Sequence, residues 1–206
     1  MKVLLINGSP HKEGCTYTAL SEVARVLNEN GVETEIFHIG SRPVGGCVAC
    51  GGCKKLGRCA FEDSVNEALP KVAAADGIVF GSPVHYASAA GSMAGFMHRL
   101  SICGGKYLQY KPAACVVSAR RAGTTAALDE LVKVPQYHNM PLVSGNYWCM
   151  VHGSKAEDVL CDEEGLQVMR ALGRNMAWLL RSIEAGKAAG VPQPESEAKI
   201  YTSFIR

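Results

Sequence analysis

Four cysteines lie close together in the chain: Cys47, Cys50, Cys53 and Cys59. Compact spacing of this kind lets one loop present four thiolates to an iron–sulfur cluster, and the glycines between the cysteines permit the turns that such a loop requires. A structural zinc ion would use the same thiolates, usually from two separated Cys-x-x-Cys pairs. A loop of free thiols, or a cysteine motif that holds no cluster, is also consistent with the spacing. The cysteines therefore predict metal binding or redox chemistry.

A second group of residues that could do chemistry follows the first apolar run. Ser9, Gly14, Cys15 and Thr16 lie between that run and the first helical stretch. Backbone N–H groups at a helix start, together with the hydroxyls, can hold a phosphate without a lysine or a metal ion. A Walker phosphate loop is excluded because no Gly-Lys-Ser/Thr follows, and the G-x-G-x-x-G fingerprint is also missing here. An ordinary strand-to-helix turn is the alternative interpretation.

The elements that must position these residues alternate between apolar runs and helical stretches. Continuous apolar or β-branched runs predict five strands, at 2–7, 32–39, 77–80, 113–118 and 141–144. Helical spacing of apolar residues, as at Leu20, Val23 and Leu27, predicts the helices between them. Helices are expected at about 17–30, 64–75, 93–100 and 124–133, and from about 162 onward. Pro70 is expected to kink or divide the second helix, and residues 40–63 are expected to form a loop.

Strands that alternate with helices require a parallel sheet covered on both faces. The predicted fold is α/β: a flavodoxin-like, doubly wound, five-stranded parallel sheet in the order 2-1-3-4-5, with a cysteine-rich loop inserted after strand 2. In such sheets, ligands bind beyond the carboxyl ends of the strands. Polar residues follow strands one, three and four of this prediction. We therefore expect them to meet at one edge of the sheet.

Two loops and one helix end resemble those of a known family. Residues 8–16, Gly-Ser-Pro-His-Lys-Glu-Gly-Cys-Thr, resemble the G-S-P-R-x-x-G-N-T loop of the NADPH-dependent FMN reductase family. Residues 81–86 resemble its second loop, G-S-P-V-Y, and residues 96–99 resemble its F-x-D-R. The chain is most similar to the iron–sulfur flavoprotein branch, over roughly residues 1–185. Cys15 stands where the family usually has Asn, which weakens one polar contact near the phosphate, and His98 replaces the usual Asp.

The resemblance implies an FMN site and a metal site. The residues that it places around FMN are Ser9, His11, Gly14, Cys15, Thr16, Ser82, Pro83, Val84, His85, Tyr86, Ser118, Arg120, Arg121 and Gly123. An arginine near N1 and O2 of the ring would stabilise the anionic reduced flavin. If the motif matches, Cys47, Cys50, Cys53 and Cys59 ligate a 4Fe–4S cluster. Residues 147–153 are either a buried aromatic cluster or a wall of the active site, with His152 as a weak candidate proton donor.

The function implied is an FMN-dependent oxidoreductase. Electrons from NAD(P)H would pass through FMN to a quinone, a flavin, an iron–sulfur centre or another small acceptor, without a catalytic side chain. A flavodoxin-type carrier is the alternative, although the formal charge of +2 differs from the acidic surface of flavodoxins. A metal-binding redox module without nicotinamide oxidation is another. The family also implies a homodimer or a higher even homo-oligomer.

The order and composition of the residues predict the division into domains, the classes of partner and the location of the protein. Residues 1–189 are predicted to form one FMN-binding domain with the cysteine-rich insertion at 45–60, and residues 190–206 a tail or an arm that reaches a neighbour. The basic residues form no stripe, so neither nucleic acid nor a membrane surface is an expected partner. Only four apolar residues follow Lys2, too few for a signal peptide. The expected location is therefore the cytoplasm, where thiols stay reduced.

Overall fold

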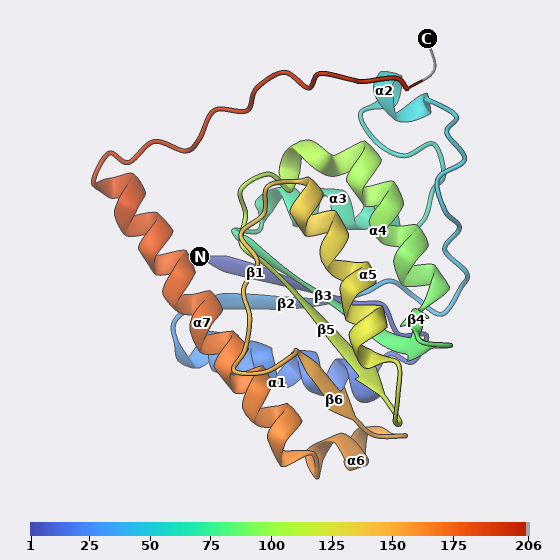
Figure 1. The fold of residues 1–206 in the computed structure, drawn as a ribbon, viewed down its shortest axis with the longest axis vertical. Helices are drawn as coiled ribbons and strands as arrows, with labels where there is room; N and C mark the ends of the chain where they lie inside the picture. The colour runs from blue at the N-terminus through green and yellow to red at the C-terminus, as the bar shows by residue number, and fades with distance from the viewer. Residues whose placement is uncertain (205–206) are drawn as a thin grey trace.

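A parallel sheet forms the centre of the computed structural model, which describes residues 1–204 (Figure 1). Its strands follow the order β2-β1-β3-β5-β6, and every neighbouring pair in this path is parallel. The strands are β1 (Lys2–Asn7), β2 (Glu33–His38), β3 (Gly77–His85), β5 (Ala113–Ala119) and β6 (Met150–His152), and the two-residue β4 (Ser88–Ala89) pairs antiparallel with β3. The predicted flavodoxin-like fold and strand order are confirmed.

Helices cover both faces of this sheet, as the continuous apolar strands require. Successive side chains of a strand point to opposite faces, so Leu4 and Ile6 pack with α3, α4 and α5, whereas Val3 and Leu5 pack with α1 and α7. The helices are α1 (Cys15–Glu29), α2 (Gly52–Leu56), α3 (Ser64–Ala74), α4 (Gly91–Gly104), α5 (Thr124–Tyr137), α6 (Ala156–Leu160) and α7 (Glu163–Ala188), with a 3₁₀ turn at Gly105–Tyr107. The core that contains α1 and α7 holds the strands against α1.

The prediction that Pro70 divides a helix is wrong, because α3 runs unbroken through it. A proline removes one backbone hydrogen bond and crowds the preceding turn. Pro70 lies on the exposed side of α3, whereas Val65, Leu69 and Val72 are buried against the sheet. The packing of this buried stripe outweighs the local cost. Within the loop expected at 40–63, the structure also forms the short helix α2.

The fifth strand lies further along the chain than predicted. Residues 141–144 make only an isolated bridge, between Leu142 and Ala113. The strand is β6, whose three residues pair with Val117, Ser118 and Ala119 at the end of β5. A short apolar run indicates that a segment is buried, but it does not indicate which strand the segment pairs with. The residues just before β6, at 147–149, have no strand periodicity. The predicted residue range of the fifth strand is therefore wrong, whereas its predicted position in the sheet, next to the fourth strand, is correct.

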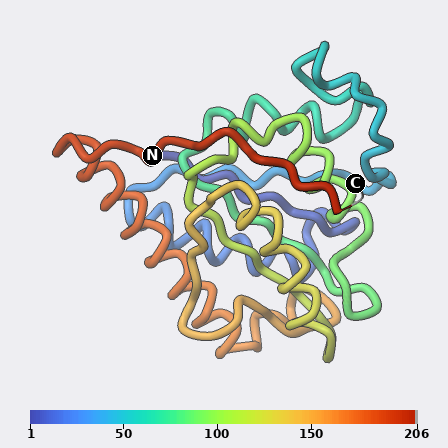
Figure 2. Tube along the Cα trace, turned by 45° about the horizontal axis from the view of Figure 1, so that its top comes forward, coloured from blue at the N-terminus to red at the C-terminus, as the bar shows by residue number. Residues whose placement is uncertain are grey.

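The carboxyl-terminal segment beyond α7 is extended and crosses the molecule (Figure 2). It contacts the end of the domain that lies opposite to the carboxyl ends of the strands. Ser196 shares a hydrogen bond of 3.3 Å with the Tyr110 hydroxyl, and the Lys199 ammonium lies 3.6 Å from the centre of the Tyr137 ring. Helix α7 ends at Ala188. The division into a domain at 1–189 and a tail or arm at 190–206 stays a prediction, and residues 205–206 lie outside the described residues. In the part of the chain that is described, no helix is long and apolar enough to span a membrane.

Candidate functional site

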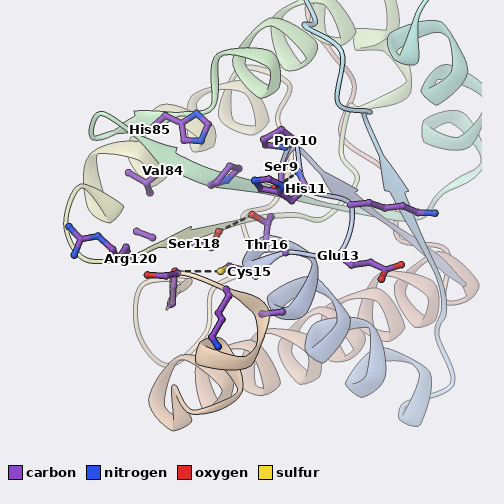
Figure 3. Close-up of a pocket in the computed structure, with 18 of the residues that line it drawn as sticks. Ser9, Pro10, His11, Glu13, Cys15, Thr16, Val84, His85, Ser118 and Arg120 are labelled. Carbon is purple, nitrogen blue, oxygen red and sulfur yellow. Dashed lines mark hydrogen bonds between the residues drawn. The ribbon is translucent and has the colours of Figure 1, made fainter.

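A pocket of about 850 Å³ lies beyond the carboxyl ends of β1, β3 and β5, the edge where the fold predicts a ligand (Figure 3). Four segments far apart in the sequence line it: the loop from β1 into α1, the end of β3, the end of β5, and the turn that leads from β6 into α6. The parallel sheet brings these segments together because the carboxyl ends of its strands meet at one edge. The pocket is therefore the candidate binding site.

The loop from β1 into α1 leaves backbone N–H groups available for an anion. Gly14 occupies the N-cap position of α1, and no side chain among residues 1–204 caps the helix start with a hydrogen bond. Buried Asn7 shapes the loop: its Oδ1 accepts from the Ser9 N–H at 3.0 Å, and its Nδ2 donates to the Lys12 carbonyl at 3.0 Å. The positive end of the helix dipole points to the same place. The arrangement suits a phosphate group.

Hydroxyl groups connect this loop to the end of β5. Thr16 Oγ1 and Ser118 Oγ lie 2.8 Å apart in the protein interior, and the dashed line in Figure 3 marks this hydrogen bond. Ser9 Oγ accepts from the His11 N–H at 3.1 Å. All three hydroxyls belong to residues that line the pocket. The donors and acceptors that could bind a phosphate are therefore held in place before any ligand arrives.

We expect the Thr16–Ser118 pair to contribute measurably to stability. Thr16→Val keeps the side-chain shape but leaves the Ser118 hydroxyl buried without its partner, which should lower the free energy of unfolding by about 1–3 kcal/mol. Adding Ser118→Ala should cost less than its effect in the wild-type background, because it removes the unpaired group. Urea unfolding of the two single variants and the double variant measures this coupling. Strictly additive losses would contradict the pairing.

Cys15 makes a different contact from the one that its position in the loop suggested. Its thiol donates to the Gly153 carbonyl at 3.4 Å, which ties the start of α1 to the segment after β6 (Figure 3). Burial raises the pKa of the Cys15 thiol, so it keeps its proton at neutral pH and remains a donor. Cys15 therefore lines the pocket but directs its sulfur toward the protein backbone.

A tight hairpin between β3 and β4 forms another wall of the pocket. Val84 and His85 line the pocket, whereas Tyr86 and Ala87 form the turn with positive φ angles of 52° and 60°. Such angles are costly for residues other than glycine. Glu130 holds β4 in place, because its Oε2 accepts hydrogen bonds from the Ser88 hydroxyl at 2.5 Å and from the Ala89 N–H at 2.8 Å. The strained turn is thus held by contacts outside it.

The loop after β5 touches this hairpin closely. Gly123 has a φ angle of +90°, and a Cβ atom at this position would lie 2.6 Å from Ala87 Cα. Only glycine fits both the backbone angle and the space. Gly123 therefore positions the two loops against each other instead of lining the pocket itself.

The structure brings most of the predicted site residues together. Those that line the pocket are Ser9, His11, Gly14, Cys15, Thr16, Pro83, Val84, His85, Ser118 and Arg120. Four lie outside its lining. Ser82 is buried, with its hydroxyl bonded to the Ala90 N–H and the Pro83 carbonyl. Tyr86 is fully exposed at the hairpin tip, and Arg121 and Gly123 belong to the neighbouring loop.

Sequence reasoning missed two parts of the site. Asn7 ends β1, and the apolar run predicts it only as the last residue of a strand. The segment 154–157 lines the pocket beside α1, but its sequence carries no motif. Tyr147 and Trp148 line a separate apolar pocket of about 490 Å³, next to Cys115 and Cys149. His152 lies outside the first pocket, and its backbone N–H donates to Asp162 at 2.7 Å. Of residues 147–153, only Gly153 lines the candidate site.

The four clustered cysteines line a third pocket, of about 280 Å³, called the cysteine pocket below. Cys47 and Cys50 are exposed, and Cys53 and Cys59 are half-buried. Within residues 1–204, no group of three or more His, Cys, Asp or Glu side chains is arranged so as to hold a metal ion. The donor set nevertheless fits a thiolate-ligated cluster, because the described lining combines thiols with the Arg99 guanidinium and contains no carboxylate.

The candidate FMN pocket beyond the strands and the cysteine pocket share no lining residue among those described. Helix α4 begins beside the β3–β4 hairpin (Figure 1). Arg99 and Cys103, in its later turns, line the cysteine pocket. At a rise of 1.5 Å per residue, the twelve steps from Gly91 to Cys103 span roughly 18 Å. Cys103 is a fifth thiol in the cysteine pocket, which sequence spacing did not predict because it comes from a distant helix.

Comparisons with known proteins agree with this geometry. The family model of NADPH-dependent FMN reductase matches residues 1–155. An iron–sulfur flavoprotein of Methanocaldococcus jannaschii is 31% identical over 194 residues, covering 89% of this chain and 100% of the relative. An iron–sulfur flavoprotein of Methanosarcina thermophila is 25% identical over 192 residues, covering 91% and 99%.

Solved structures share the fold at low sequence identity. A flavoenzyme NAD(P)H:(acceptor) oxidoreductase from Paracoccus denitrificans superposes with a TM-score of 0.65 at 17% identity, covering 88% of this chain and 97% of the other. A WrbA-like flavodoxin from Agrobacterium tumefaciens gives a TM-score of 0.61 at 18% identity, with coverage of 88% and 97%. At such identities the likeness supports the flavodoxin-like fold alone.

Proposed function

The chain belongs to the NADPH-dependent FMN reductase family, and from this premise we propose that it is an oxidoreductase that binds FMN beyond the ends of β1, β3 and β5. Electrons would enter from NAD(P)H and leave to a small acceptor such as a quinone, a flavin or an iron–sulfur centre. When bound, FMN supplies hydride and single-electron transfer. The protein supplies the phosphate anchor, the walls around the ring and the charge at its edge.

One observation carries this proposal: the uncapped start of α1 opens into a pocket that Ser9, Thr16 and Ser118 also line. Backbone N–H groups and hydroxyls are the donors that a phosphate monoester requires, and the helix dipole favours its negative charge. The volume of about 850 Å³ falls within the usual range of ligand pockets, roughly 300–1,000 Å³. The residues present therefore fit FMN.

The remaining lining supports a place for the flavin ring. Pro83, Val84 and His85 give one wall an apolar and aromatic character, and Arg120 lies across the opening from the phosphate loop (Figure 3). A positive charge near the electron-accepting edge of the ring favours its reduced, anionic form. We assign this role to Arg120. Stabilising the reduced flavin in this way requires no acid or base on the protein.

We further propose that Cys47, Cys50, Cys53 and Cys59 hold a 4Fe–4S cluster. The shared pocket and its thiol-rich lining support a thiolate-ligated site, and the compact spacing of the four cysteines favours a cluster over a zinc ion, which usually takes two separated Cys-x-x-Cys pairs. The proposed assembly is a homodimer or a larger even homo-oligomer. Because α4 separates the two pockets within one chain, a second copy could bring a cluster nearer to a flavin. Light scattering of the purified protein would measure the assembly.

Anaerobic purification followed by spectroscopy tests the proposal. We expect a flavin absorption spectrum, release of FMN on acid treatment, and iron and sulfide together with it. Oxidation of NADH and of NADPH should each be measured with a dye acceptor. A colourless protein that takes up no FMN would contradict the proposal at its first step.

A flavodoxin-type electron carrier is the second candidate. The exposure of Cys47 and Cys50 favours it, since a cluster at the surface could exchange electrons with a redox protein. Such a carrier would bind FMN and yet fail to oxidise either nicotinamide in the dye assay. The same experiment therefore separates the two functions.

A further inference from the structure

Helix α4 contains a buried charge that the FMN site does not use. Arg99 is only 3% exposed, and it lies between Phe96 and Leu100, which pack into the core. A buried guanidinium is costly unless its N–H groups are paired with hydrogen-bond acceptors. The partners of Arg99 therefore indicate what the residue does.

The guanidinium links a cysteine of the loop to a carboxylate. Its Nε and Nη2 donate to Cys59 Sγ at 3.3 and 3.0 Å. Its Nη1 and Nη2 donate to the two oxygens of Asp63 at 2.5 and 3.1 Å. Asp63 also caps α3, because its Oδ1 accepts from the Val65 N–H at 3.1 Å. Arg99, on α4, thus connects the Cys59 sulfur to the residue that caps the start of α3.

The backbone of Cys59 is fixed as well. Its N–H donates to Asn66 Oδ1 at 2.9 Å, and its carbonyl accepts from Asn66 Nδ2 at 3.0 Å. By contrast, Cys47 and Cys50 are exposed, and the turn between them contains Ala49 with a φ angle of 54°. The cysteine loop therefore has one end whose sulfur and backbone are both held by the core.

We propose that Arg99 is a positioning residue for the iron–sulfur cluster: it fixes Cys59 as the anchored thiolate ligand and stabilises the added negative charge of the reduced cluster. Hydrogen bonds to the ligand sulfurs and nearby charge are among the factors that set the reduction potential of such clusters. The two N–H···S bonds and the positive charge of Arg99 both stabilise the reduced cluster, and both therefore raise its reduction potential. This inference rests on the cluster of the proposed function.

Three variants test this role. Arg99→Gln removes the charge and most of the fork of donors, and Arg99→Lys keeps the charge but loses the fork. Arg58→Gln is the matched control, because Arg58 lies in the same loop, is exposed and pairs with Glu62 instead of a sulfur. Each variant should be reconstituted anaerobically with iron and sulfide. Iron retention against a chelator and the cluster midpoint potential are then measured, with FMN uptake and thermal unfolding as tests of folding.

We expect Arg99→Gln to lower the apparent affinity for iron by about 10–100-fold, the usual cost of losing a residue that orients a metal ligand. Its midpoint potential should be more negative than that of the wild type, whereas Arg58→Gln should shift it less and retain iron. Arg99→Lys should lose iron with a smaller shift in potential, and it serves as the test variant if Arg99→Gln does not fold.

Two results would overturn the inference, and they differ in what else they imply. Variants at Arg99 that keep both the iron retention and the midpoint potential of the wild type would overturn the role of Arg99 alone. A wild-type protein that binds FMN but takes up no iron would overturn the proposed cluster, and the role of Arg99 with it.

Discussion

Replacing Gly8 by alanine is expected to weaken FMN binding by roughly tenfold to a hundredfold, since overpacking of a tight site usually costs about 1–3 kcal/mol. Gly8 joins β1 to the phosphate loop, and its N–H donates to the Gly81 carbonyl at 2.8 Å. A Cβ atom at Gly8 would lie 2.8 Å from that same carbonyl oxygen and 2.6 Å from Met93 Sδ. Met93 can move, but the β3 backbone cannot, so the loop must shift.

The matched control for this change is Gly45→Ala. A Cβ atom at Gly45 would have no neighbour within 4 Å, so the same substitution should leave FMN affinity unchanged. Titration of the flavin-free proteins with FMN, followed by flavin fluorescence, measures both. Equal affinities for the two variants would show that the phosphate loop tolerates displacement, and would contradict the proposed anchor.

The strands could be predicted from short-range signals in the sequence, and their order followed from the flavodoxin-like arrangement that alternating strands and helices favour. Buried parallel strands are continuous apolar runs, and β1, β3 and β5 all have this character. The errors arose where a long-range contact decided the outcome. Residues 150–152, and not the apolar run at 141–144, form the strand that pairs with β5. In α3, the burial of Leu69 and Val72 outweighs the local cost of Pro70.

The same division holds for the candidate site. The phosphate loop is one continuous segment whose residue types and position after β1 predict its chemistry. Arg99 and Cys59 are 40 positions apart, and their contact depends on how α4 packs against the cysteine loop. No local pattern signals such a contact. The segment 154–157 enters the pocket for a similar reason, because β6 places it beside the start of α1.

The proposed anchor also predicts a large preference for FMN over riboflavin, which lacks the phosphate. A hydrogen bond to a charged group is worth about 1.5–3 kcal/mol, so two such bonds predict that FMN binds roughly 10²–10⁴-fold more tightly. Titration of flavin-free protein with each flavin measures the ratio. Comparable affinities would contradict a phosphate held at the start of α1.

Lysines at the rim of the pocket provide the control that identifies the source of this preference. Lys12 and Lys155 line the pocket but are exposed, and exposed ion pairs contribute only about 0–1 kcal/mol because water screens them. If backbone N–H groups and hydroxyls hold the phosphate, Lys12→Ala and Lys155→Ala should retain most of the preference for FMN. If the preference disappears in these variants, surface charge and not the helix start holds the phosphate. The backbone geometry of α1 would then have no special part in cofactor choice.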